Sequence, residues 1–73
     1  MKLGSTLKNG ATVFAFYSDM AGYNFVAAKF HHDNDSFVTW RTDSEWNTFL
    51  GHYFKTREEA LKDLYNRISA IEV

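Results

Sequence analysis

The chain has 73 residues, a formal net charge of −1 and no cysteine. This length leaves room for one core and no second domain, and the lack of cysteine excludes disulfides and thiolate zinc sites. The near-zero charge provides neither the positive field of a typical nucleic-acid binder nor the strong acidity of a DNA mimic. We therefore expect a single domain over residues 1–73, whose thin core depends on seven Phe, four Tyr and two Trp residues.

The hydropathy of the chain predicts a protein that stays in the cytoplasm. No apolar run approaches the roughly 20 residues that a membrane-spanning helix needs. Residues 1–4 open no signal-peptide core. We therefore expect a cytoplasmic protein that makes no contact with a membrane.

Segments rich in β-branched and aromatic residues predict strands that follow one another between residues 12 and 54. Short turn-forming stretches separate them, which fits antiparallel neighbours because parallel strands need a long crossover. Ahead of the first segment, Asn9-Gly10 favours a type I′ turn. Residues 3–8 therefore have room to form one extra N-terminal strand, which the sequence leaves open. The predicted strands are residues 12–17, 23–31, 36–42 and 46–54.

The hydrophobic period changes at Thr56, where a helix is predicted to begin. Residues 56–59 have the pattern of a capping box, in which the Thr56 hydroxyl serves the Glu59 amide and the Glu59 carboxylate returns to Thr56. Apolar residues then recur at three- and four-residue steps to residue 71, and the pair Asp63/Arg67 falls on the opposite face. The predicted fold class is α+β: a three- to four-stranded antiparallel meander with one C-terminal helix packed on one face.

The helix can cover only one face of this sheet, because about 15 helical residues span roughly 22 Å. Alternation along the strands separates an almost purely apolar set from a set that mixes aromatic and cationic residues. We place the apolar set under the helix and leave the mixed set open, and one bulged residue would exchange the faces from that point on. The apolar set is Phe14, Phe16, Val26, Ala28, Phe30, Val38, Trp40, Phe49 and Tyr53. The mixed set is Val13, Tyr17, Phe25, Ala27, Lys29, Phe37, Thr39, Arg41, Thr48 and His52.

The predicted core joins the apolar set to the apolar stripe of the helix. Its members are Phe14, Phe16, Val26, Phe30, Val38, Trp40, Leu61, Leu64, Tyr65 and Ile68. Gly51 lies inside the last strand segment, and a glycine there indicates a bulge or a close approach of the helix.

The open mixed face is the candidate partner-binding surface. Its rings and cations could stack unpaired bases and meet phosphates, or they could contact a protein or a second copy of the chain. The neutral charge offers little attraction for nucleic acid, so protein contact or self-association is favoured. The predicted contact residues are Tyr17, Phe25, Lys29, Phe37, Arg41 and His52.

No motif predicts catalysis, a metal or a cofactor. Residues 31–35 hold two histidines and two aspartates, but adjacent strand positions face opposite sides, and Phe37 stands where a calcium loop would need an oxygen ligand. His52 could meet Thr39 or Thr48 on one face, yet neither a nucleophile elbow nor a Gly-rich phosphate loop accompanies them. We therefore expect no enzyme, no metal site and no cofactor.

Three stretches together resemble a group of short, uncharacterised proteins carried by bacteria, their phages and mobile elements. They are Phe37-Val38-Thr39-Trp40-Arg41, Gly51-His52-Tyr53-Phe54, and Glu58-Glu59-Ala60-Leu61 with Asp63, Leu64 and Arg67. The resemblance covers residues 10–68. It implies a bacterial or phage setting and, by analogy with other small phage proteins, a protein that occludes a host protein. It carries over no functional residue.

These observations predict a small non-catalytic protein-binding module, an accessory protein of a phage or mobile element that acts on a host protein through its open aromatic face. Single-stranded nucleic-acid binding on the same face is the first alternative, because the same rings and cations serve it. A homodimeric structural protein is the second alternative.

Overall fold

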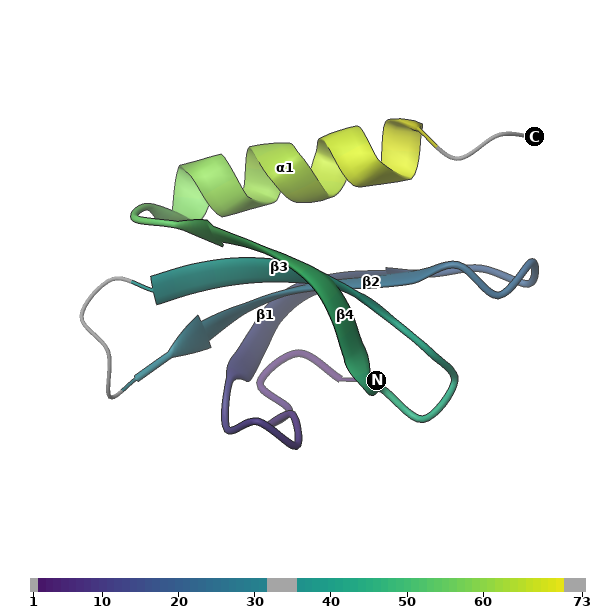
Figure 1. The fold of residues 1–73 in the computed structure, drawn as a ribbon, viewed down its shortest axis with the longest axis horizontal. Helices are drawn as coiled ribbons and strands as arrows, with labels where there is room; N and C mark the ends of the chain where they lie inside the picture. Colours follow the sequence, from purple (N-terminus) through teal and green to yellow (C-terminus); the bar gives the residue numbers. More distant parts are fainter. Residues whose placement is uncertain (1, 32–35, 71–73) are drawn as a thin grey trace.

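The computed structural model describes residues 2–31 and 36–70 and has an α+β fold (Figure 1). Within those residues, antiparallel strands form one sheet in the order β1-β2-β3-β4, and α1 lies across one face of it. The elements are β1 (Thr12–Ser18), β2 (Asn24–Phe30), β3 (Ser36–Thr42), β4 (Thr48–Phe54) and α1 (Arg57–Ser69). The predicted antiparallel meander and its C-terminal helix are confirmed.

The turns at residues 7–11, 19–23 and 43–47 share one local structure. In each, the fourth residue donates its amide to the first carbonyl, and the first residue donates its amide to the fifth carbonyl. The fourth residue has a positive φ in each case, and these residues are Gly10, Gly22 and Trp46. This arrangement is a type I turn followed by a left-handed residue, so Asn9-Gly10 does not form the predicted type I′ turn.

Residues 2–11 fold over one face of the sheet instead of adding a full strand. Thr6 forms an isolated bridge with Thr12 at the start of the outer edge of β1. Leu7 and Ala11 are buried in an apolar cluster with sheet residues. The sequence did not decide whether residues 3–8 form a strand. In the structure this segment covers the face opposite α1, as the purple trace shows (Figure 1).

A bulge in β1 exchanges two residues between the faces. The pairing of β1 with β2 shifts between Val13 and Ala15, which leaves Phe14 as the extra residue. Phe14 therefore packs with Ala15 and Tyr17 in the cluster beneath α1, whereas Val13 belongs to the cluster on the other face. The predicted sets had Phe14 and Val13 the other way round, and the bulge is the reason.

α1 covers the mixed set, so the predicted placement of the helix was wrong. Leu64 packs against Phe25 and Ala27, and Thr39 is fully buried on the same face. Small side chains such as Ala27 and Thr39 let a helix approach the sheet closely, because the distance between packed elements depends on the side chains at the contact. The apolar set has its own cover in residues 2–11.

The buried apolar residues form one cluster on each face. Phe25, Ala27 and Leu64 lie beneath α1. The other cluster contains Leu7, Ala11, Val13, Val26, Ala28, Val38 and Trp40. Of the predicted core, Phe14, Phe30 and Ile68 are half-buried, and the exposed members are Phe16 at 36%, Leu61 at 38% and Tyr65 at 71%. The last two were wrong because α1 turns Ala60 and Leu64 toward the sheet.

α1 begins with the predicted cap at Thr56. The Thr56 hydroxyl oxygen accepts the Glu59 amide at 3.2 Å. The Glu59 carboxylate accepts from the Thr56 hydroxyl at 3.0 Å, rather than from the Thr56 amide as a capping box requires. The helix ends at Ser69 with Ala70 as its C-cap, and the predicted end at residue 71 lies outside the described residues.

Candidate protein-binding surface

The predicted contact residues share one face of the sheet, but α1 crosses that face. Phe25 is only 7% exposed beneath Leu64, and the Tyr17 ring lies beside it with the centroids 6.4 Å apart. The Tyr17 hydroxyl donates to Asp19 at 2.9 Å, and this hydrogen bond raises the pKa of Tyr17. The prediction that this face is open was therefore wrong. The residues concerned are Tyr17, Phe25, Lys29, Phe37, Arg41 and His52.

Lys29 and Phe37 lie at the opposite end of the sheet from Arg41. At one end of the sheet, the Lys29 ammonium lies 5.3 Å from the centroid of the half-buried Phe37 ring, which packs edge-on against Phe14 at 5.9 Å. At the other end, the Arg41 guanidinium lies 5.3 Å from the Tyr23 ring centroid. Arg41 is exposed, whereas Lys29 and Phe37 are half-buried. The face therefore presents isolated contacts rather than a continuous platform.

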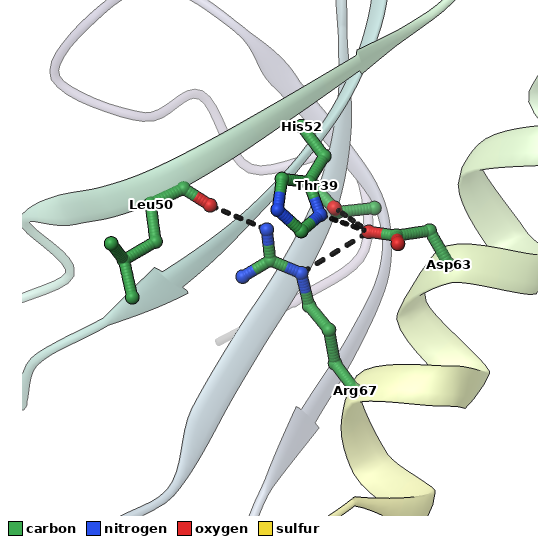
Figure 2. A network of polar contacts seen from close by, with 5 residues as sticks. All are labelled: Thr39, Leu50, His52, Asp63 and Arg67. Atoms are coloured by element: carbon green, nitrogen blue, oxygen red, sulfur yellow. Dashed lines mark hydrogen bonds and ion pairs between the residues drawn. The ribbon is translucent and has the colours of Figure 1, made fainter.

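His52 belongs to a network that ties β3, β4 and α1 together (Figure 2). One oxygen of Asp63, Oδ2, accepts from the Thr39 hydroxyl at 2.5 Å and from Arg67 Nε at 3.1 Å. The same oxygen lies 3.0 Å from His52 Nδ1, which must carry a proton because an ionised carboxylate only accepts. Arg67 also donates to the Leu50 carbonyl. Asp63 and Arg67, predicted to face solvent, therefore turn toward the sheet.

The network lowers the pKa of Asp63. Partial burial by itself raises the pKa of Asp63, but the hydrogen bonds from Thr39, His52 and Arg67 outweigh burial and hold the pKa below its ordinary value of 3.8. The buried Thr39 hydroxyl donates its hydrogen bond to Asp63 and not to His52. In a hydrolase triad the hydroxyl bonds to the histidine. The hydrogen-bond pattern therefore differs from that of a nucleophilic triad.

The β4 bulge presents a large apolar side chain to solvent. The pairing of β4 with β3 leaves Leu50 and Gly51 opposite Trp40 alone, and Leu50 has a φ of 54°. Leu50 is 70% exposed, and Phe49 beside it is 49% exposed. A Cβ placed on Gly51 would lie 2.7 Å from Trp40 Nε1. The bulge predicted at Gly51 is confirmed, and the element that approaches it is the Trp40 indole.

We call Arg41, Phe49 and Leu50 the bulge surface. Phe49 lies on the side of Arg41 because the two residues pair across β3 and β4. The bulge therefore moves Phe49 away from the predicted apolar set. The three residues line an open hollow of about 460 Å³, together with Gly22, Thr42, Asp43 and Ser44.

Only Arg41 of the bulge surface was predicted as a contact residue. An interior glycine in a strand signals a bulge, and that signal marks the neighbourhood of Leu50. The sequence does not show that Leu50, and not Gly51, adopts the left-handed conformation, because glycine is the residue that usually adopts it in a bulge.

Neither a metal site nor a membrane span is found in the described part of the chain. Within residues 2–31 and 36–70, no group of three or more His, Cys, Asp or Glu side chains is placed to hold a metal ion. In the same ranges no helix is long and apolar enough to cross a membrane. Of the histidine and aspartate tract at residues 31–35, only His31 is described, and its Nε2 lies 2.9 Å from the Thr12 hydroxyl.

No family model, curated protein or solved structure matches this chain. The resemblance to short proteins of bacteria, phages and mobile elements therefore stays a prediction.

Proposed function

We propose that this chain is a non-catalytic protein-binding module that contacts its partner through the bulge surface. The observation that carries the proposal is Leu50, an exposed leucine in the left-handed region of the backbone. A residue other than glycine in this conformation costs roughly 1–2 kcal/mol. Backbone strain of this kind clusters at functional sites, where the surrounding structure holds it.

Trp46 provides the contrast that makes Leu50 informative. Trp46 also has a left-handed backbone, with a φ of 63°, but its ring packs against the buried cluster opposite α1. Its strain is offset by packing inside the fold. Leu50 has no such compensation, because most of its side chain faces solvent. Stability alone would favour glycine at this position, so the leucine side chain serves contact with another molecule.

The bulge surface is also held in place before any partner arrives. Arg67 donates to the Leu50 carbonyl, and Asp63 fixes Arg67 from the same helix. A surface that is ordered in advance loses less conformational entropy on binding.

The proposed partner is a host protein in a bacterial or phage setting, as the sequence resemblance implies, and the proposed location is the cytoplasm. We propose that the protein acts by occupying a surface of its partner and not by catalysis. This fits the network around Asp63, because the Thr39 hydroxyl is buried and hydrogen-bonded there. Single-stranded nucleic acid is less well supported, because the Phe25 ring on which a base would stack lies beneath α1.

The proposal is tested by capture with matched glycine substitutions. Tagged wild type, Leu50→Gly and Leu3→Gly are incubated with host extract, with and without nuclease, and the retained proteins are quantified. Leu3 is the control because it is another exposed leucine, at 65%, outside the bulge surface. We expect wild type and Leu3→Gly to retain one nuclease-resistant protein, and Leu50→Gly to retain it at least about tenfold less well. Leu50→Gly should melt no lower than wild type.

Equal capture by Leu50→Gly and wild type would contradict the proposal, as would capture no greater than that of the tag alone. Loss of the captured material on nuclease treatment would favour the nucleic-acid alternative. A melting temperature that rises with protein concentration in wild type, but not in Leu50→Gly, would favour the homodimer.

A further inference from the structure

The hollow beside Leu50 combines an exposed cation with exposed apolar side chains. Arg41 lies on its wall together with Phe49 and Leu50. The volume of about 460 Å³ is large enough for a short piece of peptide but is widely open to solvent. This chemistry differs from that of a purely apolar groove, because Arg41 and Asp43 lie beside the apolar contacts.

The Arg41 charge is not neutralised within the described part of the chain. Arg67 pairs with Asp63 at 3.1 Å, but no ion pair joins Arg41 to any carboxylate in residues 2–31 or 36–70. The Arg41 guanidinium instead rests 5.3 Å from the Tyr23 ring centroid. Stacking on a ring orients the guanidinium while leaving its donors available to a ligand.

Asp43 is the one carboxylate on the lining of the hollow, and it is already satisfied. Its Oδ1 accepts the amides of Glu45 and Asn47, and its Oδ2 accepts the Asn47 side-chain amide at 2.9 Å. These bonds, the Asn47 side chain first, lower the pKa of Asp43, and Lys8 adds to the effect. Among the described residues on the lining, the charged group whose hydrogen-bonding atoms have no protein partner is therefore the Arg41 guanidinium.

A second polar group on the lining lacks a partner. Thr42 is 2% exposed, and its hydroxyl has no hydrogen-bond partner among the described residues. A buried hydroxyl in that state loses its hydrogen bonds to water without replacing them. Unsatisfied polar groups are rare in folded proteins and often mark the place of a ligand or an ordered water. Thr42 follows Arg41 in β3, so its hydroxyl lies at the same end of the sheet as the guanidinium but faces the opposite side.

We propose that this hollow receives a partner segment in which a carboxylate side chain stands next to a bulky apolar side chain. Arg41 binds the carboxylate, because a guanidinium matches its two oxygens with parallel donors. Phe49 and Leu50 cover the neighbouring apolar side chain. The inference rests on the proposed function, since it names the chemistry of the partner at the same surface.

The test uses isotope-labelled full-length protein and synthetic peptides. The probe is acetyl-Gly-Ser-Glu-Leu-Ser-Gly-amide, and the matched peptides carry Gln in place of Glu or Ser in place of Leu. We expect the first peptide to shift the amide resonances of Gly22 and Leu50 and the Arg41 side-chain resonance, with a dissociation constant on the order of 1 mM. Each matched peptide should bind about tenfold more weakly, because each loses one of the two contacts.

Arg41→Gln provides the reciprocal change, and Arg57→Gln is its control. Arg57 also has its guanidinium over a ring, 4.6 Å from the Phe14 centroid, but it does not line the hollow. We expect Arg41→Gln to weaken the Glu-Leu peptide about tenfold and Arg57→Gln to leave it unchanged. Arg41→Lys, which keeps the charge but not the planar fork, should fall between them.

The outcomes separate this inference from the proposed function. Equal binding of the Glu-Leu and Gln-Leu peptides, or a response of Arg41→Gln like that of wild type, would overturn the carboxylate assignment. Acetate that reproduces the shifts of the Glu-Leu peptide would overturn the apolar half. If partner capture depends on Leu50 but is unchanged in Arg41→Gln, the proposed function stands and this inference fails. If the peptide binds as expected but capture ignores Leu50, the proposed function fails instead.

Discussion

α1 covers one face of the sheet with thirteen helical residues, whereas residues 2–11 cover part of the other face with a turn and an isolated bridge. The face beneath α1 has a small apolar centre and, on the flank toward β4, the polar network of Asp63. The opposite face is the more apolar of the two. The composition of a face therefore does not identify the segment that covers it. Only Lys55 and Thr56 separate β4 from α1, and this short connection limits where α1 can pack.

The largest effect should come from the apolar anchor of α1. Leu64→Ala removes the buried side chain that joins α1 to Phe25 and Ala27. We expect a loss of about 2–5 kcal/mol in the free energy of unfolding, which is a large share of the total for a small domain. Urea unfolding followed by tryptophan fluorescence measures it.

Leu61→Ala is the matched control, because Leu61 is 38% exposed on the same helix. We expect a loss below about 1 kcal/mol, since an exposed leucine has little packing to lose. Equal losses for the two leucines would show that α1 sits on the sheet in a different rotation from the one described.

The opposite face should respond to a single added methyl group. In Gly51→Ala, the new Cβ would meet Trp40 Nε1 at 2.7 Å, so the indole must move within its buried cluster. We expect a loss of about 1–3 kcal/mol, as for other overpacked cores. Comparison of Gly51→Ala in wild type and in a Trp40→Leu background checks the cause, because the loss should largely disappear once the indole is gone.

The elements of the fold were predictable from the sequence because they depend on neighbouring residues. Alternation marked the strands, and the cap at Thr56 marked the start of α1. The way in which these elements pack together was harder to predict from the sequence. Phe14 and Leu50 are not recognisable as bulge residues from their types, yet each bulge exchanges the residues around it between faces. A prediction based on strict alternation therefore assigns Val13 and Phe49 to the wrong sides.

The candidate site was predictable only in part, for the same reason. Arg41 was predicted as a contact residue and is exposed beside the hollow. Phe25 was predicted with it and is buried, because the helix packs on the side with the small residue Ala27. Leu50 was absent from the prediction, since its exposure depends on a left-handed φ that leucine rarely adopts. Long-range pairing and backbone strain are the features that local patterns do not contain.

The smallest stability effect expected is the acid dependence of the network around Asp63. The fold lowers the pKa of Asp63 below 3.8. Its contribution to stability is therefore fully present above the unfolded-state pKa and is lost as the pH falls through the folded-state pKa. Asp63→Asn removes the charge while keeping the size of the side chain. We expect it to cost about 1 kcal/mol at neutral pH, with the difference from wild type shrinking below about pH 4.

Urea unfolding of both proteins at a series of pH values measures this difference. Thr39 from β3, His52 from β4 and Arg67 from α1 face the carboxylate and are unchanged in Asp63→Asn. Asp19 and Asp43, whose pKa values are also lowered, titrate in both proteins and cancel in the comparison. A difference that stays constant to about pH 2 would show that the charge of Asp63 does not stabilise the fold. A difference that shrinks as expected would show that the charge of Asp63 stabilises the fold through the groups that face it.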